Sequence, residues 1–522
     1  MAWIALKHPD RRFHTVLGLA LAWALSTGLA HGQTLGLPAL GDGESISLSA
    51  ERQLGDRIAR ELFRDPDYLE DAVLDEYIQQ LWAPLVRAAV ARGELSAELQ
   101  ERFAWRILLG RDRSVNAFAL PGGYLGVHLG LMAVVSTADE LASVLAHELS
   151  HVTQRHIARG MSEQSKMTPW VVGSMILGAL AASKNPQAAQ ALIVGGQAAA
   201  IQTQLGYTRD MEREADRVGF GILVDAGYDP GGFVSMFAKL QQAAGLNDSG
   251  AFPYLRSHPL TTERMADMQA RQQLNVPSPK PLPDMAHAML AARARVLSQS
   301  SPDALKAWIQ GPASLSATAT AADRAAALYA ASLSHLLLRD AEGTSRHLQS
   351  LSALVQAHRH LPSHAAAQRW LRLLQAEVAE RQDQPALAVK VLTQESPGQR
   401  LQRPELMALS QVLQRLPDHP LWPSVTAQLR DLVQQTPLDA QAWDRLSGLL
   451  SVQGQALPAL RAAGEAQAAR LDWPGAVDRF RAAQELALAG RLKPGEHIEA
   501  SIVDVRLRHA RERLRALQAP ER

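Results

Sequence analysis

Two kinds of hydrophobic spacing alternate along the first third of the chain. Between about residues 48 and 100, stretches such as "DRIARELF" and "EYIQQLWAPLVRAAV" repeat apolar residues at three- and four-residue spacing, which predicts helices. The spacing then changes, and residues 102–110 ("RFAWRILLG") and 116–132 ("NAFALPGGYLGVHLGLM") are predicted strands, with Pro121-Gly122-Gly123 forming a turn. This part of the chain is therefore expected to combine helices with a small sheet.

The helical spacing returns over residues 136–159, "STADELASVLAHELSHVTQRHIAR". Ser136 or Thr137 can cap the start of this helix, and Glu140 occupies the position that a capping box requires. A second predicted helix covers residues 207–230, and the segment "SHPLTTERMADMQ" at 257–269 closes the region. Its strongest polar motifs therefore fall on helices.

A long, weakly polar stretch separates these two helices, at residues 168–205. A polar interruption, Lys184-Asn185-Pro186, divides it, and neither half reaches the roughly 20 residues that span a bilayer. We interpret the stretch as a packed helical hairpin. The alternative is a hydrophobic surface within residues 170–201 that touches a membrane or an unfolded substrate.

Beyond residue 284 the sequence is almost wholly helical and rich in Ala and Leu, with turns roughly every 15 residues. Near the end, the spacing of Trp443, Leu446, Leu450 and Gly454 is like that of a tetratricopeptide repeat. The pattern predicts a helical solenoid with a concave binding surface, and a compact bundle of the same helices is the alternative. The expected fold is mainly α.

Composition limits the possible partners and the chemistry. At 522 residues the chain is too long for one core, so two or three domains are expected. A formal net charge of +1 gives no sign of a nucleic-acid partner. Cysteine is absent, so disulfides and thiolate ligands are excluded, and any zinc site must use His, Asp and Glu.

The first 32 residues have the three-part order of a secretory signal peptide. Lys7, Arg11 and Arg12 precede an apolar run at 16–25, and small residues follow around Ala30. A single membrane anchor is the alternative, but the apolar run is short for it. No cysteine follows the predicted cleavage point, so a lipid-anchored lipoprotein is not expected.

The motif H-E-x-x-H lies in the 136–159 helix, as His147, Glu148 and His151. Four residues apart on a helix, the two imidazoles can point at one ion, while Glu148 can contact a water molecule beside it. By chance the pattern arises in roughly one chain of this length in 40, so it needs support. His156, five residues beyond His151, is expected on another side of the helix and in solvent.

The third ligand decides the class of zinc site. A metzincin needs Gly at position 154 and His at 157, and this chain has Gln154 and Ile157. In "MEREAD", Glu212 can instead complete a His₂Glu site that leaves the fourth position open, and Asp216 can accept the free N–H of a ligand histidine. Glu214 is expected to face away from Glu212. An ordinary charged helix face is the alternative, which the upstream H-E-x-x-H disfavours.

"HELSH", "EREAD" and "SHP", behind a signal peptide and ahead of repeats, resemble the periplasmic β-barrel assembly-enhancing proteases, a gluzincin family. The resemblance implies one zinc ion held by His147, His151 and Glu212, with Glu148 as catalytic base and Asp216 in support. It also implies that His258 can occupy the open zinc position and hold the enzyme shut, or stabilise an oxyanion once it has moved.

The resemblance implies a division into a signal peptide (1–32), an α+β zincin-like metallopeptidase domain (33–273), a proline-rich linker (274–285) and a tetratricopeptide-repeat-like helical domain (286–522). The implied activity is a periplasmic zinc endopeptidase that degrades misfolded or stalled outer-membrane proteins, with the repeats docking it to the β-barrel assembly machinery. The strand at 116–120 is a candidate for pairing with extended substrate.

Two other functions remain open at this point. A periplasmic chaperone or adaptor that acts mainly through its repeats, with a latched zinc site of low activity, is the alternative. An integral-membrane CAAX-type protease is disfavoured, because no segment after the signal peptide is long enough to span a bilayer.

Overall fold

The computed structural model of the protein describes residues 46–163, 208–244, 253–274, 284–394, 400–416, 418–490, 492 and 495–518. The chain from Ile46 to Arg522 forms one compact unit. The predicted signal peptide, the weakly polar stretch 168–205 and most of the predicted linker lie outside the described residues. Within the described ranges, no helix is both long enough and apolar enough to cross a membrane.

Three helices open the structure, as the spacing predicted: α2 (Leu48–Arg64), α3 (Ala72–Ala91) and α4 (Ala97–Arg102). Each begins at a capping side chain, because Ser47, Asp71 and Ser96 each accept a hydrogen bond from the backbone N–H three residues later. A short strand, β1 (Tyr68–Leu69), lies between α2 and α3 and was not expected.

A four-stranded sheet follows, built from β1, β2 (Arg106–Gly110), β3 (Ala117–Leu120) and β4 (Tyr124–His128) in the order β1-β2-β4-β3. The pair β2–β4 is parallel, and β3–β4 is antiparallel. The predicted turn is confirmed as a 3₁₀ turn, η1 (Pro121–Gly123), in which Gly122 and Gly123 adopt φ of 71° and 83°. Strand β3 therefore lies at an edge of the sheet.

The predicted strand 116–132 is too long by four residues. The strand ends at His128, and residues Leu129–Val134 form helix α5 instead. A short apolar run is compatible with a strand or with a buried helix, and only the packing of the whole domain decides between them.

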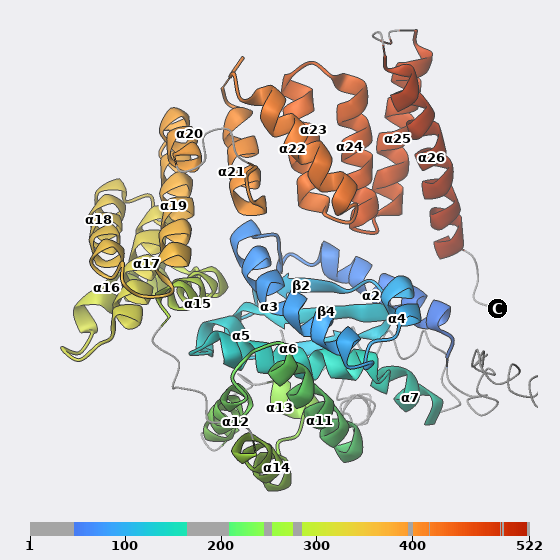
Figure 1. The fold of residues 1–522 in the computed structure, drawn as a ribbon. Coiled ribbons are helices and arrows are strands. Elements are labelled where there is room, and N and C mark those ends of the chain that lie inside the picture. The colour runs from blue at the N-terminus through green and yellow to red at the C-terminus, as the bar shows by residue number, and fades with distance from the viewer. Residues whose placement is uncertain are drawn as a thin grey trace, which may run out of the picture. The chain divides into compact units, whose positions relative to one another are not determined.

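The two faces of the sheet bury different partners. Leu125 and Val127 of β4 join a large core that includes helix α6 (Ala138–Thr153). Tyr124 points the other way and packs with residues of α2 and of the C-terminal helices. Figure 1 shows α6 on one side of the sheet and α2 on the other. In the part of the chain that the structure describes, α6 is followed by α7 (His156–Glu163), α11 (Arg209–Asp225), α12 (Gly231–Ala244), α13 (Tyr254–Ser257) and α14 (Thr262–Gln273).

Helix α6 is buried along nearly its whole length, from Glu140 to Thr153. Thr137 caps it by accepting from the Glu140 N–H, and the Glu140 carboxylate accepts from the Ser136 N–H at 2.6 Å, so both predicted capping residues take part. The predicted continuous helix over 136–159 is wrong at its end. Arg155 has φ of 53°, which breaks the helix and starts α7 at His156.

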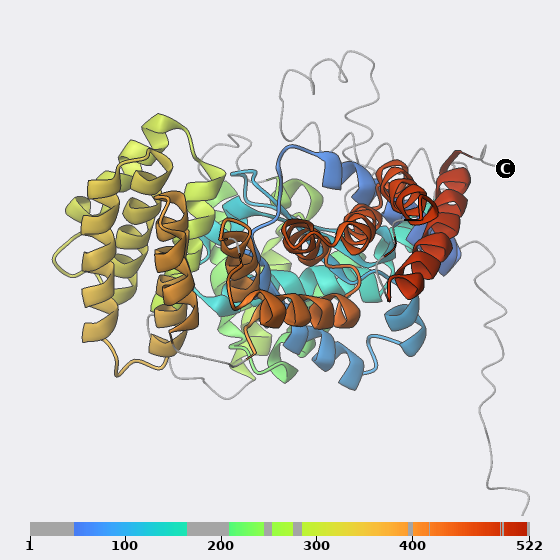
Figure 2. The same cartoon turned by 90° about the horizontal axis from the view of Figure 1, so that it is seen from above.

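The rest of the described chain is helical and was predicted as such. Its elements are α15 (Met285–Ser298), α16 (Pro302–Gln310), η2 (Gly311–Ser314), α17 (Ala321–Leu337), α18 (Ala341–Ala357), α19 (His364–Arg381), α20 (Pro385–Thr393), α21 (Arg403–Leu413), α22 (Trp422–Gln435), α23 (Ala440–Val452), α24 (Ala456–Ala469), α25 (Trp473–Leu488) and α26 (His497–Gln518). Neighbouring helices follow one another in chain order (Figure 2). The fold class, mainly α with a small sheet, is confirmed.

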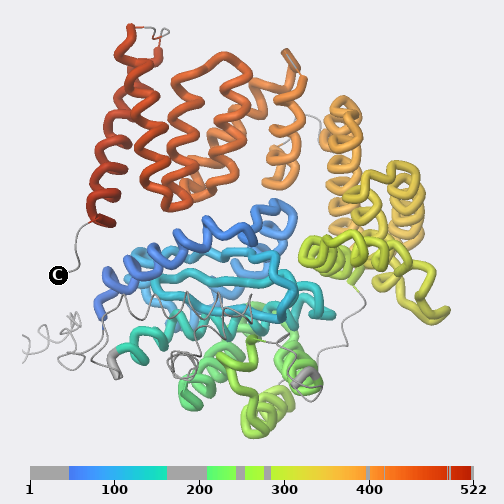
Figure 3. Tube along the Cα trace, turned by 180° about the vertical axis from the view of Figure 1, so that it is seen from behind, coloured from blue at the N-terminus to red at the C-terminus, as the bar shows by residue number. Residues whose placement is uncertain are grey.

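Four arginines of these helices bind the acidic start of α3, and we call this set the arginine interface. Its pairs are Arg470–Glu70 (2.8 Å), Arg293–Asp71 (2.6 Å), Arg403–Asp75 (3.7 Å) and Arg369–Glu76. Each arginine also contacts a second carboxylate within the helical region, at Asp444, Glu377, Asp439 and Glu405 respectively. The arginines therefore tie the C-terminal helices to α3, which lies beside them in Figure 3.

Two of the contacts between these arginines and their second carboxylates recur at a fixed spacing along the chain. Arg369 contacts Glu405 and Arg403 contacts Asp439, each pair being 36 residues apart in the chain. The second pair thus lies 34 residues after the first. That is the length of a tetratricopeptide repeat, so it supports the prediction of repeats in this region.

Candidate metal centre

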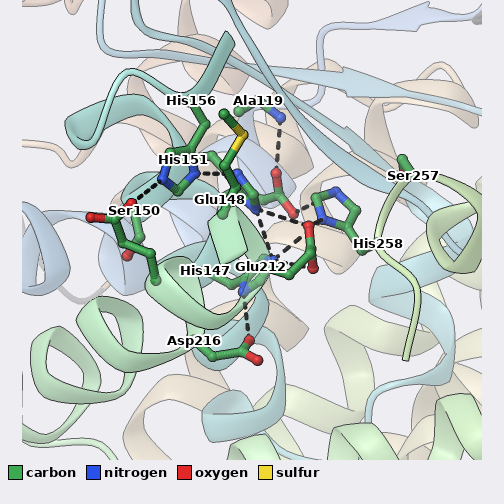
Figure 4. Close-up of polar contacts among 12 residues, drawn as sticks. Ala119, His147, Glu148, Ser150, His151, His156, Glu212, Asp216, Ser257 and His258 are labelled. Atoms are coloured by element: carbon green, nitrogen blue, oxygen red, sulfur yellow. Dashed lines mark hydrogen bonds and ion pairs between the residues drawn. The ribbon is translucent and has the colours of Figure 1, made fainter. Parts of the chain in front are cut away.

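Four side chains from three parts of the chain converge at one buried point. His147 and His151 lie on α6, Glu212 lies on α11, and His258 directly follows α13. Their ligand atoms all lie within 4.8 Å of one another. Each residue is about 1% exposed, so the cluster is shielded from solvent. Figure 4 shows the four side chains pointing toward a common centre.

The distances in the cluster are those of donors that share one target. The Nε2 atoms of His147 and His151 are 3.0 Å apart, and the two carboxylate oxygens of Glu212 lie 3.5 Å from them, Oε2 from His147 and Oε1 from His151. His258 Nδ1 lies 2.9 Å from Glu212 and 3.3 Å from His147 Nε2. Two imidazoles and a carboxylate that aim their lone pairs at one point form the donor set that Zn²⁺ prefers. The residues present therefore fit a zinc ion.

The close approach of α11 to α6 depends on a glycine that the sequence reading missed. A Cβ atom added at Gly219 would lie 3.0 Å from the carbonyl oxygen of Ala146 and 3.2 Å from the Cα of His147. Gly219 lies seven residues after Glu212, which is two helical turns, so both residues face α6. The glycine lets the backbones approach, and the Glu212 carboxylate then reaches the two histidines.

Glu148 lies beside the cluster with its carboxylate turned toward the sheet. One carboxylate oxygen accepts a hydrogen bond from the Ala119 N–H of edge strand β3 at 2.9 Å, and the other lies 3.4 Å from His258 Nε2. Burial raises the pKa of the Glu148 carboxyl. This position suits a base better than a ligand, because the carboxylate faces the edge strand and lies outside the set of converging donors.

Asp216 contacts His147 on the side where its predicted supporting role requires it. Its carboxylate lies 3.0 Å from His147 Nδ1. Burial lowers the pKa of His147, but its contacts with Asp216 and Glu212 outweigh burial and raise that pKa to about 9. A carboxylate on Nδ1 leaves Nε2, the nitrogen nearer Glu212, as the donor toward the centre.

Arg264 of α14 is a residue that the sequence reading did not single out. It is 4% exposed and donates two hydrogen bonds to Asp216, at 2.6 and 2.8 Å, while it also lies 2.6 Å from Glu212. Burial raises the pKa of Asp216, but Arg264 and His147 outweigh burial and lower it. Arg264 also donates to the carbonyl oxygen of Pro259, so it links the carboxylates of α11 to the residue after His258. Helix α14 also contains Arg271, and the sequence gives no signal that distinguishes the role of Arg264 from that of Arg271.

His156 contradicts the expectation that it is solvated. It is 1% exposed, and its Nδ1 lies 2.9 Å from His151 Nδ1 while its Nε2 lies 3.0 Å from Glu214. The reason is the break at Arg155, which turns the chain so that His156 does not continue the helix of His151. Glu214 faces away from the four converging donors, as predicted, and contacts His156 and Arg159.

His258 is held in place by its neighbours. The ring of Tyr254 stacks on it, with centroids 4.5 Å apart and planes 24° apart. The backbone N–H of His258 donates to the carbonyl oxygen of Tyr254. The backbone N–H of Tyr254 donates to the carbonyl oxygen of Val115, close to the start of β3. The segment that carries His258 is thus attached to the same part of the sheet that Glu148 contacts.

Comparisons with known proteins agree with this site. The sequence model of Peptidase family M48 matches residues 77–272, a range that includes all of the side chains described above for the cluster. The chain is 33% identical over 288 residues to the beta-barrel assembly-enhancing protease of Escherichia coli (strain K12), covering 53% of this chain and 56% of that protein. It is 34% identical over 288 residues to the protein of that name from Yersinia pestis, covering 54% and 56%.

A more distant similarity connects the site to a eukaryotic enzyme. The chain is 29% identical over 197 residues to the mitochondrial metalloendopeptidase OMA1 of Arabidopsis thaliana, covering 37% of this chain and 36% of that protein. The match to the bacterial relatives spans little more than half of their length. The resemblance inferred from the motifs is confirmed over this part, because residues 77–272 match the zinc-dependent peptidase family M48 and contain the four side chains that could hold one metal ion.

Proposed function

We propose that the protein is an exported zinc-dependent endopeptidase that degrades misfolded or stalled outer-membrane proteins. The observation that carries the proposal is the buried convergence of His147, His151 and Glu212, with the Glu148 carboxylate beside them. The names of the bacterial relatives support a role in outer-membrane protein assembly. The predicted signal peptide supports a periplasmic location.

In this proposal His147, His151 and Glu212 hold the metal, and the other side chains act around it. A bound zinc ion would supply Lewis-acid activation of a water molecule and of the scissile carbonyl. Glu148 accepts the proton of the water and then delivers it to the leaving amine. Asp216 and Arg264 keep His147 and Glu212 oriented through the contacts at 3.0 and 2.6 Å.

Strand β3 is the proposed place for the substrate backbone. It is an edge strand, so its outer side can pair with an extended chain. Ala119 of β3 donates to Glu148, and a strand added along this edge would therefore run past the catalytic carboxylate. Pairing through the backbone favours unfolded or stalled chains, because folded proteins rarely expose an unpaired strand.

His258 is proposed as a latch on the zinc. Its Nδ1 lies among the other donors, so His258 would fill the position that a catalytic zinc site keeps open for water. While His258 stays there, water and substrate are excluded, and when it moves away it can donate to the developing oxyanion. His258→Ala in the full-length protein should then raise basal cleavage of an unfolded substrate while zinc stays bound.

The decisive test is Glu148→Gln in the full-length protein, assayed on a reduced, unfolded model substrate. The amide keeps the shape but cannot accept the proton, so cleavage should fall by about 10²–10⁴-fold. Zinc content, measured by atomic emission, should stay near one ion per chain. Glu140→Gln removes another buried carboxylate of α6, near its start, and is the matched control that should retain activity. Unchanged cleavage in Glu148→Gln, or a wild-type protein that binds no zinc, would refute the proposal.

A chaperone or adaptor function is the second candidate, because His258 occupies the cluster and the long helical region offers a docking surface. The two functions separate in cells that lack the wild-type protein. If Glu148→Gln restores outer-membrane protein assembly as well as wild type does, the helical region carries the function. Docking to the β-barrel assembly machinery is tested by co-purification with the same variant, which cannot degrade its partner.

A further inference from the structure

The two histidines of the H-E-x-x-H motif are each supported on the side away from the cluster, but by different groups. His147 Nδ1 contacts a carboxylate directly, that of Asp216, at 3.0 Å. His151 Nδ1 contacts another imidazole, that of His156, at 2.9 Å, and His156 Nε2 contacts Glu214 at 3.0 Å. We propose that His156 and Glu214 form a relay that positions His151 for metal binding. This inference rests on the proposed zinc site.

Helix α11 supplies every carboxylate in these contacts. In "EREAD", Glu212 lies among the converging donors, Asp216 supports His147, and Glu214 ends the relay behind His151. Residues two positions apart point to nearly opposite sides of a helix, so the Glu214 side chain cannot reach the four converging donors itself. It contacts His156 at the start of α7 instead, and His156 in turn contacts His151 of the H-E-x-x-H motif.

The relay exists because the chain breaks at Arg155. In a continuous helix, a residue five positions after His151 would be rotated by roughly 140° away from it. Arg155 adopts φ of 53°, and its guanidinium binds the buried Glu51 at 3.0 Å and the carbonyl oxygen of Ile46 at 2.6 Å. The start of α2 therefore fixes the turn that returns His156 to His151.

Hydrogen-bond chemistry sets the direction of the relay. If Nε2 of His151 faces the metal, its proton must be on Nδ1, and it donates to Nδ1 of His156. His156 then carries its own proton on Nε2 and donates to Glu214, whose carboxylate also accepts from Arg159 at 2.7 Å. Each of the two imidazoles then uses one nitrogen as donor and the other as acceptor, and Glu214 only accepts, so the ring of His151 can neither flip nor change tautomer without breaking a buried contact.

A merely structural role for His156 makes a different prediction. Removing a buried imidazole would then lower the free energy of unfolding without changing the affinity of the folded protein for zinc. His287 is a suitable comparison, since it is 3% exposed, lies on α15 and contacts Tyr77 and the carbonyl oxygen of Val135, away from the cluster. His287→Ala should destabilise the protein and leave zinc affinity unchanged.

The test measures zinc affinity of full-length variants by competition with a chromophoric chelator, together with the visible absorption of the cobalt-substituted protein. His156→Ala should lower zinc affinity about 10–100-fold and change the cobalt spectrum. His156→Asn places an amide oxygen near the position of Nδ1, and should recover most of that affinity. His156→Gln places its amide near the position of Nε2, and should resemble His156→Ala. Glu214→Gln, which leaves His156 in the core, should show a smaller loss.

Several results would overturn the relay. It is wrong if His156→Ala binds zinc within about twofold of wild type, or if Asn and Gln at this position behave alike. If His156→Ala does not fold, an unchanged zinc affinity and cobalt spectrum in Glu214→Gln would be sufficient to reject it. The variant His151→Ala distinguishes a failure of the relay from a failure of the proposed zinc site. Wild-type affinity in His151→Ala would refute the metal site, whereas a loss there with none at His156 refutes the relay alone.

Discussion

The metal centre is a buried cluster of polar and charged side chains, the arginine interface is a partly buried one, and their atoms are arranged differently. In the arginine interface each carboxylate of α3 faces a guanidinium, as in Arg293–Asp71 at 2.6 Å. In the metal centre, nitrogen and oxygen donors face one another at 2.9–3.5 Å. Charges that are already paired indicate a structural contact, while lone pairs that converge on one point indicate a cation-binding site.

The two clusters should therefore respond to different perturbations. The arginine interface contains its own opposite charges, so removing one partner leaves the other buried and unpaired. The metal centre instead brings lone-pair donors of four side chains together around one point, so its stability should depend on the ion supplied from solution.

Removing the metal should give the largest effect. A chelator should abolish cleavage of an unfolded substrate, and added zinc at about 1,000 times its Kd should raise the free energy of unfolding by about 4 kcal/mol. Urea denaturation with and without zinc measures this gain. Glu212→Gln should lose both activity and the zinc-dependent stabilisation. A full stabilisation by zinc in Glu212→Gln would show that the ion binds elsewhere.

Breaking the arginine interface should destabilise the protein without affecting zinc. Arg293→Met leaves Asp71, a carboxylate with only 10% of its side chain exposed, without its partner, and should cost about 3–5 kcal/mol in urea denaturation. The double variant Arg293→Met with Asp71→Asn should recover part of that loss, because no lone charge remains and Asn still caps α3. Zinc affinity should stay at the wild-type value in both. A reduced affinity would mean that the two clusters are coupled.

Removing the support of one ligand should have an intermediate effect. Asp216→Asn replaces the carboxylate on His147 Nδ1 and should weaken zinc binding by about 10–100-fold, which corresponds to roughly 1.4–2.7 kcal/mol. Chelator competition measures it. Asp225→Asn, at the far end of the same helix and half-exposed beside Arg92, is the control that should bind zinc normally. Equal affinities in the two variants would contradict the supporting role.

Replacing Asp75 should change the free energy of unfolding least, and unlike the substitutions above it should stabilise the protein. Burial raises the pKa of Asp75 from 3.8 to about 8, although Arg403 opposes this shift. Between these pH values the folded protein holds a proton that the unfolded chain has lost, so stability from this group falls as pH rises from about 4 to 8. Its side chain is 27% exposed, and solvent screening reduces the effect to about 1 kcal/mol.

Asp75→Asn should accordingly raise the free energy of unfolding at pH 8 and change it little at pH 4. Thermal melts across this range measure the difference. Asp71→Asn is the contrasting variant, since burial raises the pKa of Asp71 but Arg293 outweighs burial and lowers it. Asp71→Asn should therefore lower the free energy of unfolding at pH 8. A destabilised Asp75→Asn at pH 8 would show that its contact with Arg403 is worth more than its burial costs.

Residue spacing was sufficient for the elements whose signal is local. The H-E-x-x-H histidines share a helix face because they are four residues apart, and the capping residues of α6 lie beside it in the chain. The absence of cysteine limited a zinc site to His and carboxylate ligands before any geometry was known. The helical C-terminal region was equally visible in its apolar spacing. The domain boundaries at 33–273 and 286–522 remain predictions.

Long-range packing decided the features that spacing could not. Strand β4 ends at His128 and helix α5 follows. The apolar run fits either a strand or a buried helix, so its spacing could not predict this boundary. His156 is buried because Arg155, tied to Glu51 more than 100 residues earlier in the chain, breaks the helix. Arg264 joins Asp216 and Glu212 across 48 residues or more, and no local pattern marks it.

The sequence by itself determined which chemistry the chain can perform, because that depends on residue types at helical spacing, as in His147, Glu148 and His151. The tertiary structure alone decided how those groups are held. It brought Gly219 against α6, turned His156 back onto His151, and placed His258 among the donors. Contacts between distant segments depend on backbone approach and burial, and neither is encoded in the spacing of neighbouring residues.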